Sequence, residues 1–415
     1  MILTKYKLGE ILDVTRGASL SGEYYATEGE YIRLTCGNFD YQNNCFKENK
    51  SKDNLYYVGD FKSEFLMEEG DIITPLTEQA IGLLGSTAII PESGKYIQSQ
   101  DVAKIICKED LLDKDFAFYL ISSALVKQQL SAAAQQTKIR HTSPDKIKDC
   151  TVWIPELSEQ KRIGKLLRSI DRKIELNRAI NQNLEAMAKQ LYDYWFVQFD
   201  FPNEEGKPYK SSGGEMVWNE KLKRKIPNEW DNCKLKDFIN LFDSKRIPLS
   251  SKDREERKGN YPYYGATGIM DYVNEYIFDG DYILLAEDGS TSDSKGFPIV
   301  QYIWGKNWVN NHAHIILPKN EQYLMFTYQM LRSIPANQIE TGSIQKKISQ
   351  ENLCEYNMVL PNSILIEKYE SIISPLWEKR KLCIEEINAL IKQRDELLPL
   401  LMNGQASVNS DLSDG

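Results

Sequence analysis

The sequence contains an internal repeat, and this repeat limits the possible folds more than any other feature. Adding 206 to a residue number pairs Ser143 with Ser349, Pro155 with Pro361 and Leu184 with Leu390. The copies also open alike, with Y-K-L-G-E-I at 6–11 and C-K-L-K-D-F at 233–238. This period is much longer than the roughly 20 to 50 residues of solenoid and propeller repeats. We therefore expect two tandem copies of one globular unit.

Each copy ends in a segment with the heptad pattern of a coiled coil. Apolar residues recur at alternating spacings of four and three from Ile163 to Trp195, and the shifted positions run from Tyr369 to Leu401. Such spacing, sustained over several heptads, predicts a helix that packs along another helix. We expect the two helices to pair with each other, antiparallel within the chain.

Polar residues interrupt this pattern at four positions: Asn177, Asn181, Arg380 and Arg394. Either they lie in the seam, where polar groups cost stability but fix the register, or the seam rotates and they face water. The sequence leaves both alternatives open. Pro375 removes a backbone donor from the second helix, so we expect that helix to be bent, or broken into 363–373 and 376–403.

The composition is that of a soluble protein with enough residues for two cores. Of 415 residues, 41% are hydrophobic and 27% charged, which is ordinary for globular proteins. No apolar run approaches the ~20 residues of a spanning helix, and charge returns at Lys5 before a signal-peptide core forms. The seven cysteines are scattered and never spaced C-x-x-C. We expect reduced thiols in a cytoplasmic protein without membrane contact.

The net charge of −9 does not suit binding to nucleic acid over a large surface, because Lys and Arg contacts to phosphate dominate such affinity. A local basic cluster can still bind. One lies at Lys138, Arg140, His141 and Lys146; its repeat counterpart carries Lys346 and Lys347. A solvated loop would explain each residue singly. Recurrence at the same place in both copies favours a phosphate contact.

The globular part of each copy has a mixed α and β pattern. Turn-then-strand signals occur at 70–74 and 280–285, and helical patterns at 115–134 and 321–334. A stretch rich in Pro, Gly and Ser at 201–230 is typical of a linker. The centres of the two copies barely align, as expected if they select different targets.

The sequence lacks the common catalytic motifs, including the phosphate loop, H-E-x-x-H, G-x-S-x-G and the Asn/Asp-Pro-Pro-aromatic motif of adenine methyltransferases. Five residues could be drawn as a metal-dependent nuclease centre: Asp279, Asp281, Glu287, Asp288 and Lys295. A strand end explains Glu287 and Asp288 more simply. His312 and His314 could form a zinc pair, although a base contact or a satisfied hydrogen bond is favoured.

Six sequence blocks together carry a specific resemblance. They are L-Y-D-Y-W-F-V-Q-F-D-F-P (191–202), I-P-N-E-W (226–230), Y-P-Y-Y-G-A-T-G-I-M-D-Y-V (261–273), Y-I-L-L-A-E-D-G (282–289), W-V-N-N-H-A-H (308–314) and R-D-E-L-L-P-L-L-M-N-G (394–404). With these blocks the chain resembles, over essentially its whole length, the specificity subunit of Type I DNA restriction-modification enzymes. It departs at Glu156, where the family often repeats Pro, and the second helical segment lacks the Glu-Gln pair of the first.

The resemblance implies an α+β fold with two tandem target recognition domains, separated by two long antiparallel helices that form a coiled-coil spacer. Each domain would read one half of a bipartite site in double-stranded DNA. The spacer would set the half-site distance and dock two methyltransferase subunits and two restriction subunits. S-adenosylmethionine, ATP and Mg would act in those partners, with no cofactor or catalytic residue in this chain. The alternative is a self-contained nuclease or DNA-modifying enzyme with duplicated domains.

These considerations predict the following organisation: a first recognition domain at 1–155, a helical spacer at 156–200, a linker at 201–230, a second recognition domain at 231–361, a second helical spacer at 362–404 and a disordered tail at 405–415. The candidate DNA contacts are Lys138, Arg140, His141, Lys146, Asn311, His312, Lys346 and Lys347. No residue is expected to bind a metal.

Overall fold

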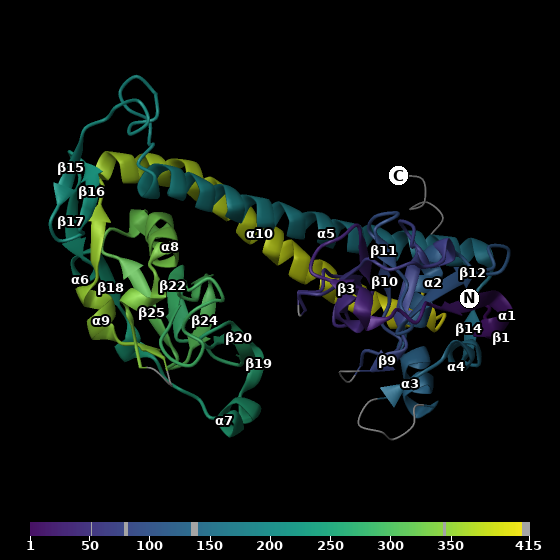
Figure 1. Cartoon of the computed structure of the whole chain (residues 1–415). Helices are drawn as coiled ribbons and strands as arrows, with labels where there is room; N and C mark the ends of the chain where they lie inside the picture. Colours follow the sequence, from purple (N-terminus) through teal and green to yellow (C-terminus); the bar gives the residue numbers. More distant parts are fainter. Residues whose placement is uncertain (51, 79–81, 134–139, 343–345, 409–415) are drawn as a thin grey trace. The chain divides into compact units, whose positions relative to one another are not determined.

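The computed structural model describes residues 1–50, 52–78, 82–133, 140–342 and 346–408. They form two compact units. The first unit combines Met1–Asn177 with Glu385–Gly415, and the second comprises Arg178–Ile384. Both contain helices and sheets (Figure 1), which confirms the predicted α+β class. Among the described helices, none has the length and apolar character needed to span a membrane.

The first unit is built on two four-stranded sheets. One has the antiparallel order β10 (Ala88–Ile89), β8 (Ile72–Pro75), β12 (Val102–Cys107) and β2 (Leu12–Arg16). The other has the order β11 (Tyr96–Ile97), β4 (Tyr31–Arg33), β7 (Tyr56–Tyr57) and β3 (Tyr25–Ala26), with β11 parallel to β4. The strand predicted at 70–74 corresponds to β8, whose residues are all buried.

The second unit repeats this plan. Its antiparallel sheet has the order β18 (Ile239–Leu241), β25 (Ala313–Pro318), β22 (Tyr282–Ala286) and β23 (Val300–Ile303). Its other sheet has the order β20 (Ile269–Val273), β19 (Lys258–Tyr264), β24 (Lys306–Val309) and β21 (Phe278–Asp279), again with one parallel pair, β19 with β24. The antiparallel sheets of the two units have the same strand order, which confirms the internal repeat, whereas the other sheets differ: their parallel pair lies at one edge in the first unit and in the centre in the second.

The repeated sequence motifs have identifiable structural roles. In the first unit β1 (Thr4–Lys7) pairs with β14 (Thr151–Ile154), and in the second β17 (Asp231–Lys234) pairs with β28 (Asn357–Leu360). A short helix precedes the later strand in each pair, α4 (Pro144–Lys148) or α9 (Gln350–Glu355). Ser143 caps α4 by accepting from the Lys146 N–H, and Ser349 caps α9 by accepting from the Asn352 N–H. A side-chain oxygen at this position satisfies a backbone donor that the helix leaves free.

The predicted helices at 115–134 and 321–334 each divide into two pieces. The first becomes α2 (Lys114–Ile121) and α3 (Ala124–Ala133), separated by Ser122 and Ser123. The Ser122 hydroxyl donates to the carbonyl oxygen of Phe118, a local bond that competes with helix continuation. The second begins as a 3-10 turn, Glu321–Tyr323, and continues as α8 (Leu324–Ser333).

The segment predicted as a linker is folded as part of the second unit, and its two ends join that unit's core. Residues 201–230 contain the hairpin of β15 (Met216–Asn219) and β16 (Arg224–Pro227). Phe201 and Trp230 at its two ends are buried and stacked, with ring centroids 5.1 Å apart. Polar turn residues dominated the composition of this stretch, but its terminal aromatic side chains are large enough to join the core.

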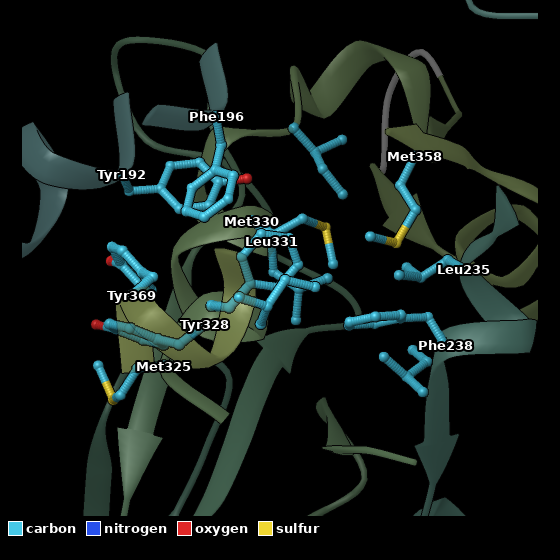
Figure 2. Packing of buried hydrophobic residues seen from close by; sticks show 14 of the residues in the cluster. Tyr192, Phe196, Leu235, Phe238, Met325, Tyr328, Met330, Leu331, Met358 and Tyr369 are labelled. Carbon is cyan, nitrogen blue, oxygen red and sulfur yellow. The ribbon is translucent and has the colours of Figure 1, made fainter. Parts of the chain in front are cut away.

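Aromatic residues bring three helices of the second unit together. Figure 2 shows Tyr192 and Phe196, at the end of α5 (Leu157–Tyr192) and in the π-turn after it, beside Leu331 of α8 and Tyr369 of α10 (Ser363–Met402). The ring centroids of Phe196 and Tyr369 lie 5.2 Å apart. All four side chains are buried, so α5, α8 and α10 share one core.

The two long helices pair antiparallel in each unit. In the first unit Asn177 of α5 donates to Glu386 of α10 at 2.7 Å, and Arg394 donates to Asp171 at 3.0 Å. From the first of these contacts to the second, the residue number falls from 177 to 171 on α5 and rises from 386 to 394 on α10. The two helices therefore run in opposite directions, as predicted. Asn177 is 5% and Arg394 8% exposed. Asn177 and Arg394 therefore lie in the seam between the helices and do not face water.

The predicted break at Pro375 is wrong, since α10 continues through it as one helix. Pro375 is exposed, and so is Ser371 four residues before it. The carbonyl oxygen that loses its intrahelical donor therefore faces solvent, where water can replace the missing bond. The packed seam on the opposite face keeps the helix intact.

Part of the segment predicted as a disordered tail is packed on the first unit. The Val408 N–H donates to Glu159 Oε1 at 3.2 Å, and Ala406 contacts the hydrophobic core. Residues 409–415 lie outside the described part of the chain.

Candidate nucleic-acid interface

Four of the predicted DNA contacts lie together in the second unit. Asn311 and His312 occupy the loop between β24 and β25, while Lys346 and Lys347 lie at β27 (Lys347–Ile348). Glu287, directly after β22, connects them. Its N–H donates to the carbonyl oxygen of His312 at 2.9 Å, and its carboxylate lies 3.2 Å from the Lys347 ammonium.

The first unit has a corresponding arrangement. There β13 (Arg140–His141) pairs with β9 (Thr77–Glu78), which follows the buried strand β8 as Glu287 follows β22. Arg140 lies opposite Glu78, with 3.6 Å between Nη1 and Oε2. In the second unit Asp288 forms the equivalent bridge with Lys347. Each unit therefore places a basic segment against an acidic strand end.

The other three candidates of the first unit differ in their surroundings. Lys146 lies on α4, and its ammonium donates to the carbonyl oxygen of Ala133 at 3.0 Å. Lys138 lies outside the described residues. His141 is exposed, and its Nδ1 lies 3.3 Å from the Thr77 hydroxyl.

Buried polar residues of the second unit hold the strands of the candidate interface together. His314 is fully buried, with Nδ1 2.6 Å from Asp243 Oδ2 and Nε2 2.8 Å from the carbonyl oxygen of Ile348. A backbone carbonyl and an ionised carboxylate can only accept, so both ring nitrogens donate. His314 thereby ties β25 to the strand that carries Lys347.

The carboxylates of this network are held in their ionised form. Burial acts to raise the pKa of Asp243, but hydrogen bonds from His314, the Ile315 N–H and Gln350 outweigh it and lower the pKa. Burial likewise acts to raise the pKa of Glu287, and bonds from Arg246 and Lys347 lower it. These are the effects expected when donors surround a desolvated carboxylate.

The described residues contain one cluster with the spacing of a metal site: Asp243, Glu287 and His314, whose ligand atoms lie within 4.8 Å of one another. In this structure both ring nitrogens of His314 already have protein partners, the Asp243 carboxylate and the carbonyl oxygen of Ile348. The Arg246 guanidinium occupies the space between the carboxylates, 2.7 Å from Glu287 and 3.5 Å from Asp243.

The nuclease centre that could be drawn from sequence is not assembled either. Asp281 lies at the start of β22 and Glu287 just after its end, about 20 Å apart along an extended strand. Asp281 is bound by Lys381 at 2.7 Å and Tyr302 at 2.9 Å. Of the two histidines considered as a zinc pair, His312 instead binds Asp288 at 2.6 Å.

Sequence analysis did not identify several residues that hold this site. Asp243 and Arg246 lie three residues apart at one 3-10 turn, whereas Glu340 and Gln350 come from other elements far along the chain. The available signal was weak: Glu287 and His314 are polar residues directly beside runs of buried apolar residues, where a charge requires a partner.

Several known proteins are similar to this chain in sequence. The sequence matches the family described as Type I restriction modification DNA specificity domain over residues 3–186 and 227–386. It is 23% identical over 330 residues to the Type I restriction enzyme MjaIX specificity subunit of Methanocaldococcus jannaschii, covering 75% of this chain and 73% of that protein. It is 34% identical over 142 residues to the putative type I restriction enzyme specificity subunit S.HindORF215P of Haemophilus influenzae, covering 34% and 35%.

A solved structure shares the fold. The crystal structure of the Type-I restriction-modification system S subunit from M. genitalium superposes with a TM-score of 0.64 at 18% identity, covering 97% of this chain and 96% of that one.

Proposed function

The chain belongs to the Type I restriction modification DNA specificity domain family and recognises DNA sequence as a specificity subunit of such a system, and we propose that each unit reads one half of a bipartite site. The strongest support is the arrangement common to both units, in which Arg140 forms an ion pair with Glu78 and Lys347 forms one with Glu287. A surface that occurs twice with different side chains suits two related but different targets.

The candidate residues divide by chemistry into two groups. The cations would contact phosphate and fix the position of the protein on the duplex: Lys138, Arg140, Lys146, Lys346 and Lys347. Asn311 and His312 carry side chains that can bond base edges. Their loop lies beside the cations of the second unit, so phosphate and base contacts could form together there. His141 would act similarly in the first unit.

The long helices would dock the other subunits of the system. Several large apolar side chains on α5 and α10 are exposed: Leu176, Met187, Ile364, Ile372, Leu382 and Leu400. Docked partner subunits would remove these apolar side chains from water. We propose two methyltransferase and two restriction subunits as partners in the cytoplasm, which supply S-adenosylmethionine, ATP, Mg and all catalysis.

Alanine variants of Arg140, Lys346 and Lys347 test the phosphate contacts in the complex with methyltransferase subunits. Each should weaken binding to every duplex about equally and lower the salt slope by roughly one unit. Lys62→Ala and Lys207→Ala remove exposed lysines elsewhere and should change little. Loss confined to one base position would indicate base readout, and no change would indicate a solvated loop.

The division of labour has its own test. The purified chain, given divalent metal or S-adenosylmethionine, should neither cleave nor methylate DNA, and it should bind its site more weakly than the complex. Cleavage or methylation by the chain alone would favour the alternative of a self-contained enzyme.

A further inference from the structure

Three cations of the candidate interface each lie against a carboxylate that is less exposed than the cation. The pairs are Arg140 with Glu78 at 3.6 Å, Lys347 with Glu287 at 3.2 Å and Lys346 with Glu340 at 3.0 Å. The cationic side chains are 42%, 52% and 53% exposed, whereas their carboxylates are 6%, 14% and 6% exposed. Both units therefore contain the same kind of pair: the cation is exposed to solvent, and its carboxylate is too little exposed for DNA to reach easily.

Other bonds fix these carboxylates in place. Glu287 accepts from Arg246 at 2.7 Å, Glu340 from the Thr291 hydroxyl at 2.6 Å, and Glu78 from the Gly82 N–H at 2.9 Å. The acid of each pair is therefore anchored, while the flexible cation can turn between it and solvent. Burial acts to raise the pKa of Glu340, but bonds from Thr291 and Lys346 lower it.

We propose that Glu78, Glu287 and Glu340 are specificity-determining residues that suppress sequence-independent binding. Each neutralises, inside the protein, the charge that its cation would otherwise offer to any phosphate. Binding to an unrelated duplex depends almost wholly on such charge, so internal pairing weakens it. At the correct site, base contacts add the remaining affinity. The inference rests on the proposed role of Arg140, Lys346 and Lys347 at phosphate.

This role is consistent with two properties of the whole chain. Its net charge is −9, so attraction to DNA must come from the few cations at the interface. A specificity subunit must also reject a large excess of unrelated DNA. Built-in elements that disfavour the wrong partner serve this purpose as well as contacts to the right one.

The test uses Glu→Gln variants at the three positions, in the complex with methyltransferase subunits. Binding is titrated at several salt concentrations against a duplex with the motif that the complex methylates and against a scrambled duplex. Each variant should bind the scrambled duplex about 3- to 10-fold more tightly. Its salt slope should steepen by roughly one unit, and its preference for the motif should fall.

Matched variants separate the possible outcomes. Glu355→Gln removes an exposed acid that pairs with Lys234 and Lys236 outside the candidate interface and should leave both affinities unchanged. The double variant Glu287→Gln/Lys347→Ala should lose the gain of Glu287→Gln. Glu340 has its own cation and provides an independent measurement if Glu287→Gln fails to fold.

The results also distinguish this inference from the proposed function. If Lys347→Ala weakens binding to all DNA while the Glu→Gln variants leave the scrambled duplex unaffected, the inference is wrong and the interface stands. Equal weakening of both duplexes by Glu→Gln would also overturn it, because the acids would then only position the cations. If Lys347→Ala, Lys346→Ala and Arg140→Ala all have no effect, the interface itself is wrong.

Discussion

Glu370 shows how one buried side chain can make a unit sensitive to pH. It lies on α10 in the second unit, 7% exposed. One carboxylate oxygen accepts from the Phe326 N–H near the start of α8 at 2.7 Å, and the other from the Ser374 hydroxyl at 3.0 Å. Burial raises the pKa of Glu370 to about 7, although both bonds act to lower it.

We predict that the second unit loses stability as pH rises from about 4.5 to 7, and that Glu370→Gln removes this loss. A carboxyl group whose folded pKa exceeds its unfolded value is deprotonated first in the unfolded state, so rising pH favours unfolding. The shift corresponds to about 3 kcal/mol at most. Glutamine keeps an acceptor for the Phe326 N–H without a charge.

The measurement is urea unfolding at pH 5 and pH 8. Tryptophan fluorescence reports on the second unit, because every tryptophan except Trp153 belongs to it. The variant should match the native chain at pH 5 and exceed its stability at pH 8. If the variant and the native chain have the same free energy of unfolding at pH 8 as well as at pH 5, the assigned role of Glu370 is wrong.

At the residue scale, the sequence repeat marks certain residues without giving their roles. Ser143 and Ser349 recur at the repeat spacing, whereas their capping of α4 and α9 is seen only in the structure. A satisfied hydrogen bond was one of the roles favoured for His314, and the structure shows two. The partners of His314 and of Glu370 could not be predicted, because each comes from another element. Only the folded core brings Glu370 to α8 or His314 to Ile348.

At the element scale, the seam between α5 and α10 contains a buried ion pair. In the first unit Arg394 donates to Asp171 at 3.0 Å, and the Tyr119 hydroxyl donates to the other carboxylate oxygen at 2.5 Å. The Arg394 and Asp171 side chains are 10% and 11% exposed. A buried pair of this kind costs most when one partner is removed, because the other charge stays buried.

We predict that Arg394→Met destabilises the first unit by about 3–5 kcal/mol, and that Asp171→Asn/Arg394→Met recovers most of the loss. The asparagine is neutral, and its carbonyl oxygen can still accept from Tyr119. Hydrogen exchange of peptides from α2, which carries Tyr119, measures the local effect. If the double variant exchanges as fast as Arg394→Met, an unpaired Asp171 is not the cause.

The heptad pattern predicted these helices and their pairing, but not every detail along them. Spacing identifies which residues are buried: Ile170 and Ile174 pack against Ile387 of α10, whereas Ile163 and Leu167 join the core of the globular part of the first unit. Whether the helix continues through Pro375 depends on which face carries the proline. Pro375 lies on the exposed face, so the lost hydrogen bond costs less than the sequence pattern suggested.

At the scale of the whole molecule, both connections between the units lie inside helices. The division falls after Asn177 in α5 and after Ile384 in α10, and the helices contain 36 and 40 residues. A helix of fixed rise, ~1.5 Å per residue, does not lengthen as a flexible linker would. We propose that the helix pair sets the distance between the half-sites.

This proposal predicts the effect of lengthening both helices. Four residues inserted within 176–183 and within 382–389 should add about 6 Å and rotate the helix by ~40°. Two further base pairs add about 7 Å along the duplex and turn the groove by ~70° in the same sense. The methylated motif should therefore keep both half-sites and gain one or two unspecified base pairs between them.

Single-molecule sequencing of modified bases in a host that expresses the complex gives the motif directly. Four residues inserted in the turn at 204–207, outside both helices, should leave the spacing unchanged. Lengthening α5 alone should abolish methylation, since the contacts of Asp171 and of Glu185 with α10 could not both keep their register; lengthening both helices should restore it. A restored complex that methylates with the original spacing would show that something other than the helices sets the distance.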